Sequence, residues 1–271
     1  MKIAVIGGAG VRTVIFINGL LKRYKKLHID EVVLYDIQEE KQKIIEKLCK
    51  HVVERNHEDL KVWAVSDPVE AITGADYIVT TLRVGGDHSR VVDETIALDL
   101  GVIGQETTGV GGFSMAVRTI PVLIEYCELI KKYAPDAWIF NFTNPSGLVT
   151  QALRSAGYDK IIGICDAPSS TKFRMAHDLG VEEDDLYVEF FGLNHLSWIR
   201  SVKKKARKSC RNFWQMMLSY RAYRNFPCLI RNCCVPSDSC RTNICTTTIT
   251  EKKRWRISKN PGQPEERLSK T

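Results

Sequence analysis

Short apolar runs alternate with amphipathic stretches along the first three quarters of the chain. The apolar runs have the length of buried strands and are expected at residues 2–6, 31–35, 62–65, 77–81, 138–142 and 161–164. Hydrophobic residues at helical spacing predict helices at residues 13–25, 39–55, 89–100, 113–133 and 148–156. In the second helix this spacing is carried by Ile44, Ile45, Leu48 and Val52. Such alternation predicts an α/β fold, in which a parallel sheet carries helices on both faces.

The first expected strand ends in a glycine-rich loop that contains Gly7, Gly8 and Gly10. Glycines at this point let the backbone turn tightly and approach a pyrophosphate at the start of the next helix. Asp36 ends the second strand, where a carboxylate binds a ribose hydroxyl and repels the 2′-phosphate of NADP. Thr13 stands in place of the third glycine of GxGxxG, so a plain strand–turn–helix cluster is the alternative. Position, spacing and Asp36 together predict a Rossmann-type doubly wound sheet that binds NAD.

Polar residues also follow the later strands, where ligands bind in open α/β sheets. Each has an ordinary structural interpretation: an arginine in a surface salt bridge, a glycine-rich loop, a buried thiol, or a histidine satisfied in the core. Sequence spacing alone does not connect them to one reaction. The residues in question are Arg83, Arg90, Glu106, Asn144, Cys165, Asp166, Asn194 and His195.

Taken together, these segments resemble glycoside hydrolase family 4, the NAD- and metal-dependent glycosidases, over about residues 1–202. The motifs that carry the resemblance are the glycine loop, Leu82-Arg83-Val84-Gly85, Gly104-Gln105-Glu106-Thr107, Asn141-Phe142-Thr143-Asn144-Pro145, Cys165-Asp166 and Phe191-Gly192-Leu193-Asn194-His195. The Phe142 and Phe191 motifs look most like the 6-phospho-β-glucosidase branch. Asp166 instead resembles the α branch, because many β members have Asn there and the 6-phospho-α-glucosidases have Asp.

The resemblance implies a redox route outside the two-carboxylate scheme of most glycosidases. NAD⁺ takes a hydride from C3 of the sugar, a tyrosine removes the proton at C2, the aglycone leaves from C1, and NADH later returns the hydride. Cys165 and His195 match the ligands of a divalent metal, usually Mn²⁺ in this family. Asp166 matches the acid that protonates the leaving oxygen, and Glu106 matches an acid that increases the basicity of the tyrosine.

The resemblance also implies the partners of the chain. The substrate is expected to be a phosphorylated disaccharide or glucoside, and full-length members are expected to form homo-oligomers. Asn144, Asn194 and Arg90 match positions that contact substrate, and Arg83 is a candidate for its phosphate. An NAD-dependent hydroxy-acid dehydrogenase and a non-catalytic nucleotide-binding remnant are the alternative functions. Neither nucleic acid nor membrane is an expected partner. The protein is expected to be soluble and cytoplasmic, because it has neither a signal peptide nor a membrane span.

The composition changes abruptly near Lys203. From there to Thr271 the chain has 17 Lys and Arg against 4 Asp and Glu, and it holds six of the nine cysteines. Read from the third base of each codon, residues 205–214 permit an ordinary turn followed by an apolar helix. A shifted reading frame at the lysine run 203–205 is therefore our hypothesis. A nucleic-acid- or zinc-binding tail is the alternative, although these cysteines fit no standard finger spacing.

Three segments follow from this reading. Residues 1–165 are expected to form the NAD-binding domain, and residues 166–202 are expected to begin the substrate domain. Residues 203–271 are expected to be an out-of-frame tail that is disordered or poorly folded. A chain of this kind lacks the tyrosine base and the second half of the sugar site, so we expect it to have little or no glycosidase activity as written.

Overall fold

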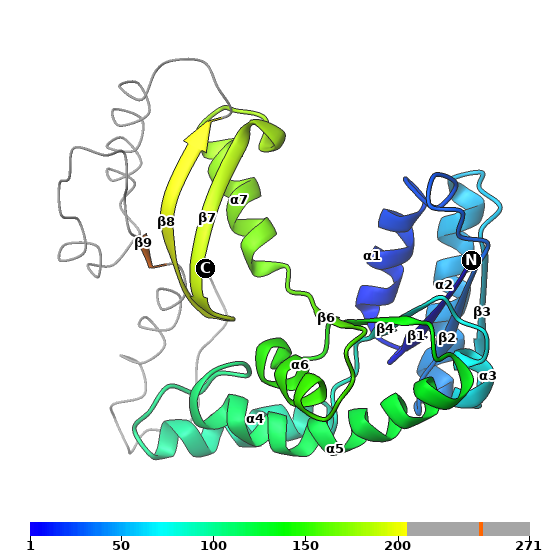
Figure 1. The fold of residues 1–271 in the computed structure, drawn as a ribbon, viewed down its shortest axis with the longest axis horizontal. Helices are drawn as coiled ribbons and strands as arrows, with labels where there is room; N and C mark the ends of the chain where they lie inside the picture. Colours follow the sequence, from blue (N-terminus) through cyan, green and yellow to red (C-terminus); the bar gives the residue numbers. More distant parts are fainter. Residues whose placement is uncertain (205–243, 246–271) are drawn as a thin grey trace, which may run out of the picture. The chain divides into compact units, whose positions relative to one another are not determined.

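The computed structural model describes residues 1–204 and 244–245, and these residues divide into two compact units. The first unit is Met1–Cys165, and the second begins at Asp166. Figure 1 shows the elements of both units along the chain. Of the tail expected from residue 203 onward, only Lys203, Lys204 and residues 244–245 are described, and the remainder of that prediction lies outside the described residues.

The first unit is built on a six-stranded parallel sheet with the strand order β3-β2-β1-β4-β5-β6. Each neighbouring pair is parallel, which confirms the predicted Rossmann-type doubly wound sheet. All six strands agree with the expected ranges to within one residue at each end. Their bounds are β1 Lys2–Ile6, β2 Glu31–Tyr35, β3 Lys61–Val65, β4 Tyr77–Thr80, β5 Trp138–Asn141 and β6 Ile161–Gly163.

Helices cover both faces of this sheet. The apolar faces of α1 and α2 pack on one side of β1 to β3, whereas α3, α5 and α6 pack on the other side. The short α3 was not expected, because five residues carry too little periodicity to be noticed. The bounds are α1 Val11–Leu20, α2 Glu39–Arg55, α3 Pro68–Ile72, α4 Gly86–Asp99, α5 Gly109–Tyr133 and α6 Ser146–Ser155.

The buried face of α2 differs from the expectation. Ile44 and Leu48 are 59% and 46% exposed, so the apolar stripe read from the sequence is partly on the outside. The residues that are buried instead lie at positions i, i+3, i+7 and i+11, and they are Gln42, Ile45, Cys49 and Val53. Burial raises the pKa of the Cys49 thiol to about 11.

One part of the sheet is less well covered on the α1 side. A hollow of about 440 Å³ lies between α1 and strands β4 and β5, lined by apolar side chains that include Phe16, Val79 and Phe140. Trp138 and Ile162 lie on the same side of the sheet, and they are 42% and 43% exposed. This apolar surface lies on the face opposite to the buried Ile139 and Ile161, as the two-residue period of a strand requires.

The second unit has its own small core, formed by α7 (Ala167–Asp178), β7 (Leu186–Leu193) and β8 (Leu196–Lys204). The strands β7 and β8 are antiparallel, and the two-residue β9 (Ile244–Cys245) pairs with β8. Leu179, Leu186 and Ile199 are buried between the helix and the hairpin. The helix α7 was not among the expected elements.

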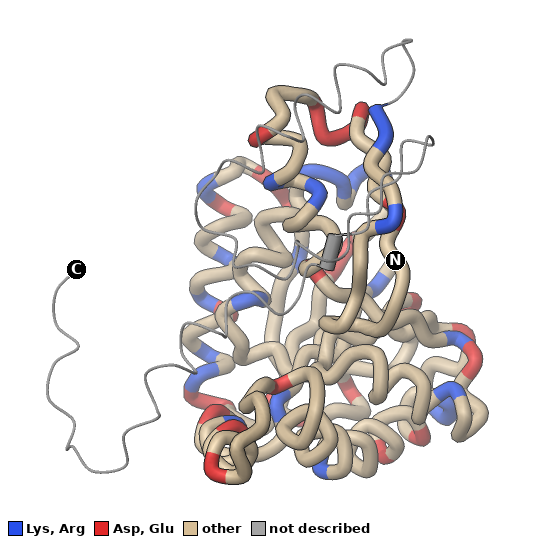
Figure 2. The backbone as a smooth tube through the Cα atoms, turned by 90° about the vertical axis from the view of Figure 1, so that its left-hand side faces the viewer, with Lys and Arg blue, Asp and Glu red and all other residues tan. Residues whose placement is uncertain are grey.

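Charged residues are distributed over most elements of the described chain. Figure 2 shows Lys and Arg interspersed with Asp and Glu along the helices. Every helix in the described part of the chain is too short or too polar to span a lipid bilayer.

Candidate active site

The glycine loop passes close to the neighbouring strands. The N–H groups of Gly7 and Gly8 donate to the carbonyl oxygen of Tyr35 at 2.9 and 2.8 Å. Gly7 has a φ of +94°, and a Cβ there would lie 2.7 Å from the carbonyl carbon of Thr81. The fold itself therefore requires glycine at position 7.

Gly10 has a different reason to be glycine. Its φ is −75°, and the nearest atom to an added Cβ would be the Gly7 carbonyl oxygen, 3.7 Å away. Nothing in the fold excludes a side chain there. Gly10 is the N-cap of α1 and supplies no side-chain cap, so the first N–H groups of the helix are open to an anion. This arrangement fits a pyrophosphate that approaches the backbone closely.

Asp36 is attached to this loop by hydrogen bonds. Its Oδ2 accepts from the N–H of Ala9 at 3.0 Å, and its Oδ1 accepts from the N–H of Gln38 at 2.9 Å. A carboxylate has about four acceptor positions, so each oxygen keeps capacity for a further donor. Its place beyond β2 and its remaining acceptors fit a ribose diol.

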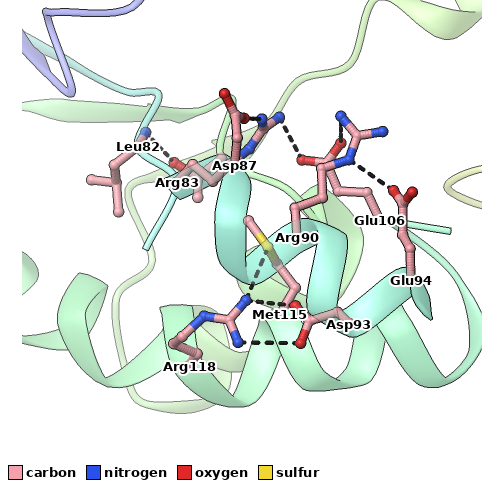
Figure 3. Close-up of polar contacts among 10 residues, drawn as sticks. Leu82, Arg83, Asp87, Arg90, Asp93, Glu94, Glu106, Met115 and Arg118 are labelled. Carbon is pink, nitrogen blue, oxygen red and sulfur yellow. Dashed lines mark hydrogen bonds and ion pairs between the residues drawn. The ribbon is translucent and has the colours of Figure 1, made fainter. Parts of the chain in front are cut away.

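Arg83, Arg90 and Glu106 lie together beyond β4 (Figure 3). Arg83 Nη2 donates to Glu106 Oε1 at 2.9 Å, and Arg90 Nη1 is 3.5 Å from Glu106 Oε2. Each arginine also pairs with an acid on α4 that lies four residues later in the sequence, Arg83 with Asp87 and Arg90 with Glu94. The interpretation of these arginines as members of surface salt bridges is thus correct in part. Both guanidinium groups also contact the carboxylate of Glu106, which comes from the segment between α4 and α5. The side chain of Glu106 is only 12% exposed.

A second ion pair joins α5 to α4 and to the segment that carries Arg83. Arg118 on α5 pairs with the buried Asp93 on α4 at 2.6 Å, and its Nε donates to the carbonyl oxygen of Val84 at 2.9 Å. Ser114 donates to the same carboxylate at 2.7 Å. The Arg118 guanidinium holds the pKa of Asp93 below its usual range. These residues could not be found from the sequence, because their pairing depends on how α4 packs against α5.

Buried polar side chains also connect the carboxyl ends of β4 and β5. Asn141 accepts from the Thr80 hydroxyl at 2.9 Å and donates to the Thr150 hydroxyl at 3.0 Å. Thr143 accepts from the N–H of Leu82 at 3.1 Å, which fixes the start of the segment that carries Arg83. The sequence offers one signal here, an asparagine at the end of an apolar strand, and the structure shows that Asn141 is fully buried.

The remaining candidates are divided between the two units. In the first unit, Asn144 follows β5 and Cys165 follows β6. In the second, Asp166 is the N-cap of α7, while Asn194 and His195 form the turn between β7 and β8. The amide oxygen of Asn194 is buried and has no hydrogen-bond partner among the described residues.

The two side chains expected to bind a metal are the thiol of Cys165 and the imidazole of His195. Within residues 1–204 and 244–245, no group of three or more His, Cys, Asp and Glu side chains is arranged to hold a metal ion. Thiolate and imidazole suit divalent transition metals, although sulfur is a soft ligand for manganese. Two protein ligands leave coordination positions for the oxygens of a substrate.

The glycine loop, the acid after β2 and the parallel sheet define the dinucleotide-binding class of α/β proteins. Within that class, the sequence profile described as "Family 4 glycosyl hydrolase" matches residues 2–181. The chain therefore belongs to glycosyl hydrolase family 4, and the resemblance drawn from the motifs is confirmed.

Individual relatives support the same family. The chain is 43% identical over 204 residues to the 6-phospho-beta-glucosidase BglT of Thermotoga maritima, a match that covers 74% of this chain and 48% of the relative. It is 35% identical over 209 residues to 6-phospho-alpha-glucosidase 1 of Lacticaseibacillus paracasei, covering 76% of this chain and 47% of that protein. The chain thus spans about half the length of the curated relatives it matches.

A solved structure gives the same picture. The 6-phospho-beta glucosidase of Thermotoga maritima, crystallised with manganese, NAD⁺ and glucose-6-phosphate, is 39% identical with a TM-score of 0.74. The similarity covers 80% of this chain and 53% of that one. Family members are thus glycoside hydrolases, and the expected cofactors, NAD and Mn²⁺, are those found in this relative.

Proposed function

We propose that this chain is the nucleotide-binding half of an NAD- and divalent-metal-dependent glycosidase that hydrolyses 6-phospho-β-glucosides. The observation that carries the proposal is the group Arg83–Glu106–Arg90 beyond β4, in a chain that belongs to family 4. Two guanidinium groups held by one carboxylate present fixed, partly exposed N–H donors, which suit the oxygens of a phosphorylated sugar. Glucose-6-phosphate is bound in the Thermotoga maritima relative.

The cofactor in this proposal is NAD. The N–H groups at the start of α1 bind its pyrophosphate, the absent side chain at Gly10 lets the backbone come close, and Asp36 accepts from the adenosine ribose. When bound, NAD supplies reversible hydride transfer to and from the sugar. Thr13 stands in place of the third glycine; its side chain is 2% exposed, and its hydroxyl oxygen is buried without a hydrogen-bond partner among the described residues.

The metal in this proposal is held by Cys165 and His195. A divalent ion there, Mn²⁺ by analogy with the relative, supplies a Lewis acid next to the sugar hydroxyls. Asp166 protonates the glycosidic oxygen as it leaves. Asn144 and Asn194 bind the sugar, and the buried, unpartnered amide oxygen of Asn194 is an acceptor suited to one of its hydroxyls.

The preference for the β anomer rests on sequence similarity. Identity is 43% to the β-glucosidase of Thermotoga maritima and 35% to the α-glucosidase of Lacticaseibacillus paracasei. The α anomer is a second candidate, because Asp166 is the residue typical of the α branch. Cleavage of paired 6-phospho-α- and 6-phospho-β-glucosides by a full-length protein distinguishes the two.

We also propose that residues 203–271 are read out of frame and that the frame-restored protein works in the cytoplasm as a homo-oligomer. The basic, cysteine-containing composition of this segment and the lysine run 203–205 support the frame proposal. Resequencing the gene across the lysine codons tests it directly. An intact frame with neither a missing nor an extra base would contradict it.

The experiment for the whole proposal uses the frame-restored protein. Release of aglycone from a 6-phospho-β-glucoside is measured with and without NAD⁺ and Mn²⁺, while absorbance at the NADH band is followed in the same sample. The proposal requires cleavage that depends on both cofactors and a hydride that is returned, so NADH does not accumulate. Stoichiometric NADH without cleavage would instead indicate a hydroxy-acid dehydrogenase. The 271-residue chain is expected to bind NAD and to show little or no cleavage.

A further inference from the structure

Gln42 occupies an unusual position for a glutamine, because it lies on the buried face of α2 and is only 4% exposed. Its side chain has three partners, all of them backbone groups at the ends of strands. The amide nitrogen donates to the carbonyl oxygens of Leu34 at 3.1 Å and Val65 at 2.8 Å. The amide oxygen accepts from the N–H of Asp36 at 2.6 Å.

These three bonds fix the end of β2 against the end of β3. Leu34 and Tyr35 are the last residues of β2, and Val65 is the last residue of β3. Both N–H hydrogens of the Gln42 amide are used, and its oxygen is used at least once, so the side chain is satisfied although it is buried. A buried amide that binds three backbone groups from two strands restricts where the chain goes after β2.

The residue placed by this restriction is Asp36. Its backbone N–H is bound to Gln42, while its carboxylate is bound to the N–H groups of Ala9 in the glycine loop and Gln38 before α2. A continuous set of hydrogen bonds therefore runs from Gln42 through Asp36 to the glycine loop. Both ends of the Asp36 residue are held, so its remaining acceptor positions have a fixed direction.

We propose that Gln42 is a positioning residue that fixes the carboxylate of Asp36 for the adenosine ribose diol of NAD and against the 2′-phosphate of NADP. Gln42 does not touch the cofactor, and it acts only through Asp36. A carboxylate that cannot swing aside repels a 2′-phosphate in full, whereas a released one turns away and tolerates it. The inference rests on the proposal that this chain binds NAD.

The test measures the Kd of the 271-residue chain for NAD⁺ and for NADP⁺ by calorimetry. Gln42→Met keeps the length of the side chain and removes all three bonds, and Gln42→Glu keeps the acceptor but removes the donors. Gln151→Glu, at an exposed position on α6, makes the same charge change and is the matched control. Circular dichroism and thermal unfolding establish that each variant is folded.

We expect roughly tenfold weaker NAD⁺ binding in Gln42→Met, with a smaller change for NADP⁺, so the discrimination between the two cofactors narrows. In Gln42→Glu, NAD⁺ binding recovers as the pH falls, relative to wild type, because a protonated glutamic acid can again donate to one carbonyl. An effect on stability alone would lower the bound fraction of both cofactors without changing their ratio. Gln151→Glu behaves as wild type.

A double-mutant cycle separates positioning from general damage. In an Asp36→Ser background, Gln42→Met is expected to change NAD⁺ affinity less than twofold, because the group it positions is gone. Equal losses for NAD⁺ and NADP⁺, or the same loss in both backgrounds, would overturn the role of Gln42. Failure of the folded wild-type chain to bind NAD⁺ would instead overturn the proposed function. If Gln42→Glu does not fold, Gln42→Met and the cycle decide the question.

Discussion

Arg118 donates from Nε to the backbone carbonyl oxygen of Val84 at 2.9 Å, and this bond joins the middle of α5 to the segment that carries Arg83. The same guanidinium pairs with Asp93 on α4. One side chain therefore connects the segment that carries Arg83 to α4, the helix that carries Arg90 (Figure 3). Gly85 completes the arrangement: its φ is +82°, and a Cβ there would lie 2.2 Å from the Ser89 hydroxyl oxygen.

Replacing Arg118 by Met is expected to destabilise the fold substantially. The substitution keeps the apolar stem but leaves Asp93, a carboxylate that is 6% exposed, without its cation. We expect a loss of about 2 kcal/mol or more in the free energy of unfolding, measured by urea denaturation. In Asp93→Asn the same Arg118→Met substitution should cost less, because no buried charge is then left unpaired. Equal costs in the two backgrounds would show that the ion pair is not the source of the effect.

The same pair predicts a dependence of stability on pH. Because Arg118 holds the pKa of Asp93 below its usual value in the folded chain, the contribution to stability is complete above the unfolded pKa of about 3.9. It is lost as the pH falls through the lower pKa of the folded state. Asp93→Asn should therefore flatten the acid limb of unfolding free energy plotted against pH. Asp99→Asn, at the exposed end of α4, is the control and should leave the limb unchanged.

Two glycines of the nucleotide loop should respond differently to alanine. Gly7→Ala places a Cβ 2.7 Å from the Thr81 carbonyl carbon at a φ of +94°, so we expect a loss of about 2 kcal/mol or more in stability. Gly10→Ala meets nothing nearer than 3.7 Å, so the fold should tolerate it. NAD⁺ affinity of Gly10→Ala should nevertheless fall roughly tenfold, because the new methyl group stands where the pyrophosphate approaches the backbone. Unchanged NAD⁺ affinity in Gly10→Ala, measured by calorimetry, would contradict this placement of the cofactor.

The strands and the nucleotide loop could be predicted from sequence because each depends on neighbouring residues. Runs such as 31–35 are apolar, short and bounded by polar residues, which is sufficient to locate a strand. The face of α2 could not be assigned in the same way. Its sequence offers two overlapping apolar stripes, and only the sheet decides that Ile45 is buried while Ile44 is exposed.

Polar residues were the harder part of the prediction, and for a related reason. A glutamine in a helix is normally expected at the surface, yet Gln42 is buried, and its amide nitrogen donates to backbone carbonyl oxygens at the ends of two strands. Asp93 and Arg118 lie 25 residues apart on separate helices, and nothing local pairs them. The motif residues Arg83 and Glu106 could be singled out from sequence, but their direct contact could be seen only after folding.

The apolar surface beside the hollow on the α1 side of the sheet should make this chain prone to self-association. Trp138 and Ile162 are 42% and 43% exposed there, on the same face as Phe140, which lines the hollow. Exposed apolar area of this kind associates readily in water. We expect light scattering to increase with protein concentration, and the double variant Trp138→Lys, Ile162→Lys to reduce that increase without lowering thermal stability.

The control for this prediction is the double variant Ile44→Lys, Leu48→Lys, on the outer face of α2, where the two residues are 59% and 46% exposed but do not line the hollow. It adds the same two positive charges at apolar positions of similar exposure, so it tests whether charge alone improves solubility. If the sheet face causes the association, the α2 variant should change the scattering much less than the sheet-face variant does. An equal reduction in both proteins would mean that net charge is the cause, and an unchanged sheet-face variant would mean that the contact lies elsewhere on the chain.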